Sequence, residues 1–357
     1  MKLVMPSVTE VKLDRSLPVP IAIMKKIERC GRIAYRSEDR ITEDSYIPFI
    51  KNIVKRNHTS VLEHGRVTIT MDITDSEQED FEQSKSSFTN YSFVQVSSVN
   101  RFDTTTRMLV FSGNLRALLD FVTCEAPHHP SCMRLTKILQ KEFQPIFGSL
   151  FEMGDSDELP YMIEETHDGH TFHVVTDRGV LAEWTRHRID MSFTVESTRY
   201  CNYEKTGMAF CLPVPFEFSP TPDDNESKWI FNVLNSVGAI ERKENNTISF
   251  CANGLPYDFF TYLPVKLLKM NIWKKHMKAS EEAYTELIQR GCTPQEARTV
   301  LPNSLKTEFC VTATRTAWDH FFSLRCAKDA HPQIRYLANK VKELVYPEGE
   351  LNDAEES

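Results

Sequence analysis

The sequence predicts an α+β fold, on the evidence of helical periodicity, one alternating segment and a missing glycine motif. Apolar residues fall at helical spacing in 21–35 and again in 331–345. Residues 67–73 alternate between apolar and polar, which is typical of a half-buried strand. The chain has no GxGxxG or GxxxxGK[ST] segment and only 12 glycines. We therefore expect no doubly wound sheet and no Rossmann or P-loop nucleotide cradle.

The composition is that of an ordinary globular protein of 357 residues, 41% hydrophobic and 26% charged. A net charge of -8 argues against a general nucleic-acid coat, although it leaves room for local basic pockets. We find no apolar run of 18 residues and no signal-like N-terminus, so we expect a cytoplasmic protein without a membrane segment. The nine scattered cysteines form no CxxC pair and predict reduced thiols.

The N-terminal half is expected to alternate helices, loops and the strand already mentioned. Along the chain we predict a leading arm, two helices, a polar loop, the strand and an acidic loop, at 1–20, 21–35, 45–55, 58–64, 67–73 and 75–80. Residues 75–170 are interpreted as an insertion in a single domain that spans 1–357. Within the insertion we expect a turn and helix start at 111–119, a helix at 135–151 and a polar connector at 154–158.

Two histidine-containing segments raise the possibility of a metal, and neither is convincing. Cys124, His128, His129 and Cys132 could hold zinc, but their proline-broken spacing fits no common zinc knuckle. Residues 58–64 lack the HxxEH spacing of a zinc enzyme. We predict no metal site.

Residues 186–200, RHRIDMSFTVESTRY, are the strongest candidate for an anion site. Arginine presents a planar fork of donors that matches phosphate and carboxylate oxygens. A solvated basic face is the alternative. The apolar residues Val180, Leu181 and Trp184 favour a helix that buries one side and delivers the arginines from its end. Glu183 could pair with Arg186 or His187 on that helix.

The C-terminal third is expected to be mainly helical. After an irregular stretch at 201–222, helices are predicted at 229–239, 272–290 and 312–325, and the acidic tail 348–357 is expected to be disordered. Gly291 is a C-cap signal, and 293–296 reads as a capping box with proline at the first helical position. Arg325 would lie in an apolar helix face, where it needs an anion or carbonyl partner; a structural salt bridge is the alternative to a ligand phosphate.

Four segments in this order resemble the flavin-dependent thymidylate synthases. They are 58–64; Arg-His-Arg, a spacer and Ser-x-Arg-Tyr in 186–200; 291–302; and the run from 314 to 335. The resemblance covers about 25–73, 171–210 and 270–345. It departs in having eight residues between Arg188 and Ser197 instead of seven, and in Ala34, Thr194, Val195 and Thr314, which replace polar residues or asparagines common in the family.

The resemblance implies reductive methylation of dUMP to dTMP, with methylenetetrahydrofolate, NADPH and FAD, in a homotetramer with shared active sites. It implies that dUMP is bound by Glu183, Arg186, Ser197, Thr198, Arg199, Arg298 and Arg325, of which Ser197 and Arg325 are the catalytic candidates. It assigns FAD contacts to His58, Ser60, Glu63, Arg186, His187, Arg188, Thr194, Thr314, His320 and His331. A related enzyme that adds a hydroxymethyl group or acts on another pyrimidine, and a non-catalytic nucleotide-binding homologue, remain alternatives. An RNA-binding module is disfavoured by the acidic balance.

Overall fold

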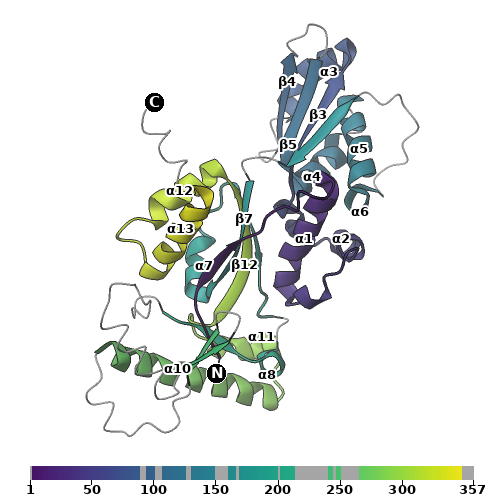
Figure 1. The fold of residues 1–357 in the computed structure, drawn as a ribbon. Coiled ribbons are helices and arrows are strands. Elements are labelled where there is room, and N and C mark those ends of the chain that lie inside the picture. Colours follow the sequence, from purple (N-terminus) through teal and green to yellow (C-terminus); the bar gives the residue numbers. More distant parts are fainter. Residues whose placement is uncertain are drawn as a thin grey trace.

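The chain folds around three four-stranded sheets, each with its own helices (Figure 1). The computed structural model describes residues 2–88, 94–100, 107–125, 130–148, 160–165, 169–199, 202–213, 240–243, 247–250 and 265–347. Helices and strands are mixed along the chain, so the predicted α+β class is confirmed. In the described part, no helix has the length and apolarity needed to cross a membrane.

The central sheet is antiparallel and positions most of the candidate site. Its order is β2-β7-β12-β8, with bounds Ser7–Glu10, Gly169–Asp177, Lys306–Thr314 and Met191–Val195. Phe309 and Val311 on β12 join the core of α7 (Arg178–Trp184), α12 (Arg315–Arg325) and α13 (Pro332–Val345). Cys310 lies on the other face and packs with Cys30 and Ile33 of α1. Both faces of β12 are therefore covered by helices.

The strand β12 corrects one sequence prediction. We expected residues 312–325 to be one helix, whereas 312–314 complete β12 and the helix begins at Arg315. A strand that is buried on both faces shows no apolar-polar alternation, so its end looked like helix. Thr314 is the N-cap of α12, and its hydroxyl accepts a hydrogen bond from the Ala317 amide at 3.4 Å.

The N-terminal elements mostly follow the prediction. Helices α1 (Val19–Tyr35) and α2 (Tyr46–Lys55) are confirmed; the 3-10 helix η1 (Glu38–Arg40) lies between them, and η2 (Thr59–His64) stands where a loop was expected. The leading arm is not irregular, because β1 (Lys2–Val4) and β2 lie in it and pair with β9 and β7.

The region expected to be an insertion supplies the strands that pair with both edges of the predicted strand. The sheet β4-β5-β3-β6 has bounds Val94–Asn100, Arg107–Asn114, Arg66–Ile73 and Tyr161–Glu165. Residues 75–80 are not a loop, since they begin α3 (Asp75–Phe88), which Phe81 anchors in the core. The expected turn at 111–114 is instead the end of β5. Three helices follow: α4 (Leu115–Glu125), α5 (Pro130–Glu142) and α6 (Gln144–Phe147).

The third sheet joins the N-terminus to the C-terminal third. Its order is β10-β11-β1-β9, with bounds Ile240–Lys243, Thr247–Phe250, Lys2–Val4 and Ala209–Cys211. It lies beside α8 (Tyr203–Thr206), α10 (Val265–Gln289), α11 (Pro294–Ala297) and η5 (Arg298–Val300) (Figure 1). The 201–222 stretch is thus partly regular, and α10 begins before the expected residue 272. The helix predicted at 229–239, the connector 154–158 and the tail 348–357 lie outside the described residues.

Candidate active site

The Arg-His-Arg segment follows directly after α7. The Asp177 side chain caps this helix by accepting from the Val180 amide at 2.8 Å. Trp184 ends the helix with a fully buried ring, stacked on Phe321 with centroids 4.7 Å apart. Because the buried tryptophan fixes the last turn, the next residues leave the helix at the surface, and the side chains of Arg186 and Arg188 are exposed.

Arg325 is bound by groups from the α7 end. Its guanidinium donates from Nη1 to Glu183 Oε2 at 3.0 Å, from Nη2 to the Glu183 carbonyl at 3.0 Å, and from Nε to His187 Nε2 at 2.9 Å. The partners expected for Arg325 are therefore found, and the carboxylate comes from the chain itself. The sequence suggested that Glu183 would pair with Arg186 or His187, whereas in the structure it pairs with Arg325.

His187 is held in its neutral form. Burial, together with the nearby charges of Arg325 and His320, lowers its pKa to about 4. Because Arg325 donates to Nε2, the ring proton is on Nδ1. His187 therefore accepts from an arginine and can donate from its other nitrogen.

Two arginines converge on the hydroxyl of Thr198. Arg178 Nη2 and Arg298 Nη1 lie 3.4 and 3.3 Å from Thr198 Oγ1. Arg178 also donates to the Glu196 carbonyl at 3.2 Å and to the Thr307 hydroxyl at 3.0 Å. Among the described residues, neither arginine forms an ion pair. Two guanidinium groups that share a neutral oxygen form a positively charged site suited to an anion.

Ser197 and Arg199 lie on either side of this threonine. The Ser197 amide donates to the Ala34 carbonyl at 3.2 Å, and its hydroxyl accepts from the Arg199 amide at 3.2 Å. Arg199 Nε lies 3.3 Å from Gln295 Oε1, on the short helix that also delivers Arg298. The structure therefore brings Arg298 next to Ser197, Thr198 and Arg199, although about 100 residues separate it from them in the sequence.

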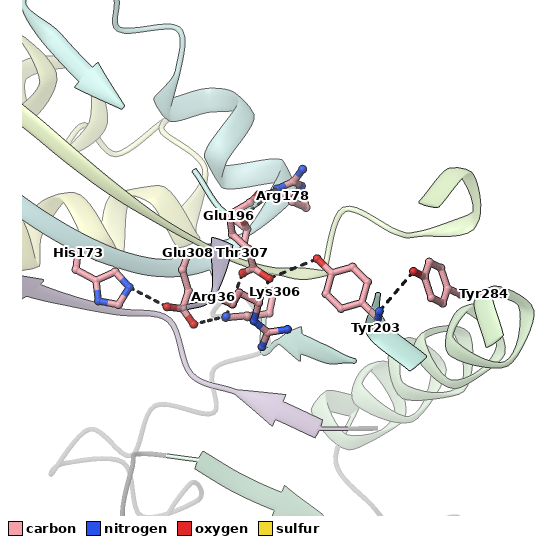
Figure 2. Close-up of polar contacts among 9 residues, drawn as sticks. All are labelled: Arg36, His173, Arg178, Glu196, Tyr203, Tyr284, Lys306, Thr307 and Glu308. Atoms are coloured by element: carbon pink, nitrogen blue, oxygen red, sulfur yellow. Dashed lines mark hydrogen bonds and ion pairs between the residues drawn. The ribbon is translucent and has the colours of Figure 1, made fainter. Parts of the chain in front are cut away.

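A buried ion network holds this segment against β12 (Figure 2). The Glu196 carboxylate is 1% exposed, and it accepts from Lys306 Nζ at 3.1 Å and from the Tyr203 hydroxyl at 3.5 Å. Arg36 Nε lies 3.6 Å from the same carboxylate. The Glu196 amide also donates to the Glu308 carbonyl at 2.8 Å. Ser197 is thus fixed by backbone and side-chain contacts of the residue before it.

Glu308 extends the network from β12 toward the neighbouring strand β7. Its carboxylate pairs with Lys306 Nζ on one oxygen and lies 2.9 Å from His173 Nε2 on the other (Figure 2). Burial acts to raise the Glu308 pKa, but the His173 hydrogen bond and the Lys306 charge outweigh it and hold the pKa at about 2. Glu308 is therefore ionised throughout the physiological range.

The three residues of 58–64 that are expected to contact flavin each lie in a different local environment. His58 Nδ1 lies 3.2 Å from the Tyr35 hydroxyl, Ser60 is exposed, and Glu63 is paired with Arg116 of α4. Thr194 is buried, and its hydroxyl lies 2.8 Å from His64 Nε2.

The other residues expected to contact flavin lie across the central sheet. Thr314 and His331 are N-caps of α12 and α13, and the exposed His320 has its ring centroid 6.0 Å from that of His187. Helices α12 and α13 cover one side of β12, whereas α1 and α2 lie on the other (Figure 1). A single chain therefore does not bring His58 and His320 together.

The sequence analysis missed Arg178, Glu196 and Lys306. Arg178 stands at the first position of a helix, which gave no sign of its contacts with Thr198 and Thr307. Glu196 adjoins the serine motif, and Lys306 begins a strand that was not predicted. An acidic residue directly before Ser197 was the one local signal available.

The metal candidates gain no support from side-chain placement. In the described part of the chain, no three His, Cys, Asp or Glu residues are grouped to hold a metal ion. Cys124 is exposed in α4 and Cys132 is buried in α5, while His128 and His129 lie outside the described residues.

Comparison with known proteins identifies the family. The family described as thymidylate synthase complementing protein matches residues 166–348, which is more than half of the chain. The chain belongs to this family. The match contains α7, the serine and arginine segment, β12, α12 and α13, so the family region includes both arginine clusters described above.

Individual relatives of the thymidylate synthase complementing family align over different lengths. A flavin-dependent thymidylate synthase of Aquifex aeolicus is 23% identical over 355 residues, 90% of this chain and 93% of its own length. One from Geobacter sulfurreducens is 28% identical over 113 residues, and the alignment spans about half of that protein, 49%, and 32% of this chain. A solved structure titled a UMP/dUMP methylase PolB from Streptomyces cacaoi, bound with 5-Br dUMP, covers 96% of this chain and 92% of its own, at 15% identity and a TM-score of 0.36.

Proposed function

We propose that the chain is a flavin-dependent thymidylate synthase that converts dUMP to dTMP. Methylenetetrahydrofolate supplies the carbon, and NADPH and FAD supply the hydride. The observation that carries this proposal is the convergence of Arg178 and Arg298 on Thr198, beside Ser197 and Arg199. Family membership and the names of the relatives from Aquifex and Geobacter support it.

The phosphate of dUMP is assigned to the Thr198 site. A dianion between Arg178 and Arg298 relieves the repulsion between two guanidinium groups and forms charge-assisted hydrogen bonds with both. Arg199 stands next to this position with an exposed side chain. The buried Glu196–Lys306 pair keeps the segment in place, so little ordering is needed when the nucleotide binds.

The residues of this chain act on the uracil by positioning and polarising it. We assign Ser197 as a hydrogen-bond donor to the nucleotide, and Arg325 as an oriented guanidinium whose remaining N–H groups donate to negative charge developing on the ring. Arg325 is already oriented by Glu183 and His187, so it is preorganised for this role. Neutral His187 adds a polar contact without a competing charge.

Exposed donors in the chain fit a bound flavin. Arg186 follows α7 and His320 is on α12, on one side of the central sheet, and His58 lies on the other; Arg188 is in the loop between α7 and β8, and all four side chains are exposed. When bound, the flavin supplies hydride transfer, which none of these side chains can perform. Because the two groups lie on opposite sides, we propose that a site is completed between subunits of a homotetramer, in the cytoplasm.

A second candidate uses the same nucleotide site. An enzyme that leaves a hydroxymethyl group on dUMP would need the same phosphate and uracil contacts, and mass analysis of the product distinguishes it.

A nucleotide-binding homologue without catalysis is motivated by the extra residue between Arg188 and Ser197 and by Thr194, whose hydroxyl is engaged with His64.

An absorbance spectrum of the purified protein with added FAD tests the proposal. We expect a flavin band that changes when dUMP is added, because both ligands would occupy one pocket. No flavin band at saturating FAD, together with retained dUMP binding, would replace the synthase by the nucleotide-binding homologue.

Replacing Arg298 tests the phosphate assignment. Arg298→Ala should weaken dUMP binding about 10- to 100-fold, the effect of losing a hydrogen bond to a charged group. Calorimetric titration with dUMP measures it. Arg290→Ala is the matched control, because Arg290 lies near the end of α10 and pairs with the exposed Glu286. Equal dUMP affinity in both variants would remove Arg298 from the site.

A further inference from the structure

A cavity of about 350 Å³ opens where α1 and α2 end. It lies on the α1 side of the central sheet, next to the segment that leads into the Thr198 site, because Arg36 contacts Glu196 and the Ala34 carbonyl accepts from the Ser197 amide. Its lining carries four arginines against a single carboxylate, Asp39; the arginines are Arg32, Arg36, Arg40 and Arg56. We call it the α1–α2 cavity. A concentration of guanidinium groups in one cavity suggests an anionic ligand.

Two of the four arginines are already neutralised. Arg32 donates to Glu28 Oε1 from Nε at 3.0 Å and from Nη2 at 2.7 Å. Arg36 lies 3.6 Å from the buried Glu196. By contrast, the side chains of Arg40 and Arg56 are exposed, and in the described part of the chain neither has an ion pair or a hydrogen bond. These two arginines are the available cationic groups of the cavity.

Arginines at helix ends often serve to bind the last carbonyl groups, and that explanation does not apply here. The Asn52 and Val54 carbonyls of α2 accept from the backbone amides of Arg56 and Asn57 at 3.1 and 3.0 Å. At the end of η1, where Arg40 is the last residue, the Glu38 carbonyl accepts from the Ile41 amide at 3.1 Å. Since backbone groups satisfy these carbonyls, the side chains of Arg40 and Arg56 are left for another partner.

The cavity also has a neutral wall beside the proposed flavin segment. Phe49 and Ile53 contribute apolar surface, and His58 closes one side, where its Nδ1 lies 3.2 Å from the Tyr35 hydroxyl. His58 is the first residue of the segment assigned to flavin. If His58 contacts flavin as proposed, a ligand in this cavity would therefore lie next to the flavin.

We propose that the α1–α2 cavity binds the oxyanion end of a co-substrate, with Arg40 and Arg56 contacting a phosphate or carboxylate group. The inference rests on the proposed synthase function, whose two co-substrates each carry such a group. One is the 2′-phosphate of NADPH, and the other is the glutamyl carboxylate of the folate. Both would place an anionic tail in the cavity and leave the reactive ring toward His58.

Calorimetric titration of the full-length protein distinguishes the two carriers. The probes are 2′,5′-ADP for the dinucleotide, and monoglutamyl and triglutamyl tetrahydrofolate for the folate. We expect Arg40→Ala/Arg56→Ala to weaken binding of one carrier about tenfold or more, through loss of two charge-assisted contacts. Lys51→Ala is the matched control, since Lys51 is an exposed cation on α2 that does not line the cavity.

Each outcome has a separate meaning. Weaker binding of 2′,5′-ADP assigns the dinucleotide phosphate to the cavity. Loss of the triglutamyl-over-monoglutamyl preference assigns the folate tail. Unchanged affinity for all probes, or no binding of any probe to the unmodified protein, overturns the proposal. The flavin spectrum with added dUMP tests the synthase function independently, because the double variant leaves the Thr198 site intact.

Discussion

At the scale of single residues, Glu196 connects the interior to the candidate site. A carboxylate that is 1% exposed is costly unless it is paired and hydrogen-bonded. Lys306, Tyr203 and Arg36 supply those partners. The same residue fixes the backbone before Ser197. The buried network therefore sets the position of the serine that is proposed to contact dUMP.

Glu308 should make protein stability depend on pH in the acid range. Its folded pKa of about 2 lies below the ordinary 4.5, so its contribution is fully present above pH 4.5 and is lost as pH falls from 4.5 toward 2. Glu308→Gln should lower the free energy of unfolding by about 2–3 kcal/mol at pH 7, after allowing for partial exposure.

Urea unfolding of Glu308→Gln and the unmodified protein at pH 7, 5 and 3.5 measures this contribution. The difference between the two proteins should be largest at pH 7 and 5 and smaller at pH 3.5. A difference that stays constant across the three values would show that the ionised carboxylate is not what stabilises the network.

At the scale of elements, the short α11–η5 segment carries two groups of the nucleotide site. Thr293 caps α11 by accepting from the Glu296 amide, while Glu296 accepts from the Thr293 amide and hydroxyl at 2.8 Å. Gly291, at φ 94°, ends the preceding turn in a conformation that favours glycine. This local chemistry presents Gln295 and Arg298 toward the 197–199 segment.

Removing the cap should affect both stability and binding. Thr293→Ala is expected to cost about 1 kcal/mol of unfolding free energy and to weaken dUMP binding severalfold, because Arg298 lies directly after the capped turn. Chemical denaturation and dUMP titration measure the two effects. Thr299→Ala is the control, since its exposed hydroxyl donates to the Glu296 carbonyl without capping the helix. Equal behaviour of the two variants would contradict the positioning role.

Elements with local signals were predicted well, and those stabilised by tertiary contacts were not. The capping box at 293–296, Gly291 and the apolar faces of α1 and α13 are set by neighbours within a few residues, so the sequence revealed them. Strand β12 is defined by β7 and β8, and α3 is anchored by the fully buried Phe81 in an acidic stretch. No periodicity in the sequence reports such contacts.

At the scale of the whole molecule, the candidate residues divide between two sides of one sheet. The sequence suggested the residue types and most positions, such as Thr198 and Arg298, because motifs survive in linear order. It could not show that Glu183 would pair with Arg325, or that His58 and His320 would lie on opposite sides, because both depend on how β12 is covered.

This division predicts complementation between two inactive variants. His58→Ala and His320→Ala should each lose thymidylate synthesis, and mixed oligomers should recover roughly a quarter of the sites, because some then combine intact residues from both chains. Co-expression with two affinity tags, followed by a tritium-release assay on dUMP, measures it. If both histidines act within one chain, no mixed site is intact and the mixture stays inactive.

The sheet β4-β5-β3-β6 joins the 75–170 region to strand β3. Strand β3 precedes that region in the sequence, yet it pairs with β5 on one side and β6 on the other, both of which lie within it. Removing residues 75–170 would leave β3 with two open edges and uncover Ile69 and Met71, which are fully buried. Such a truncated protein would be prone to aggregate, so a minimal version would have to redesign this strand as well as remove the segment.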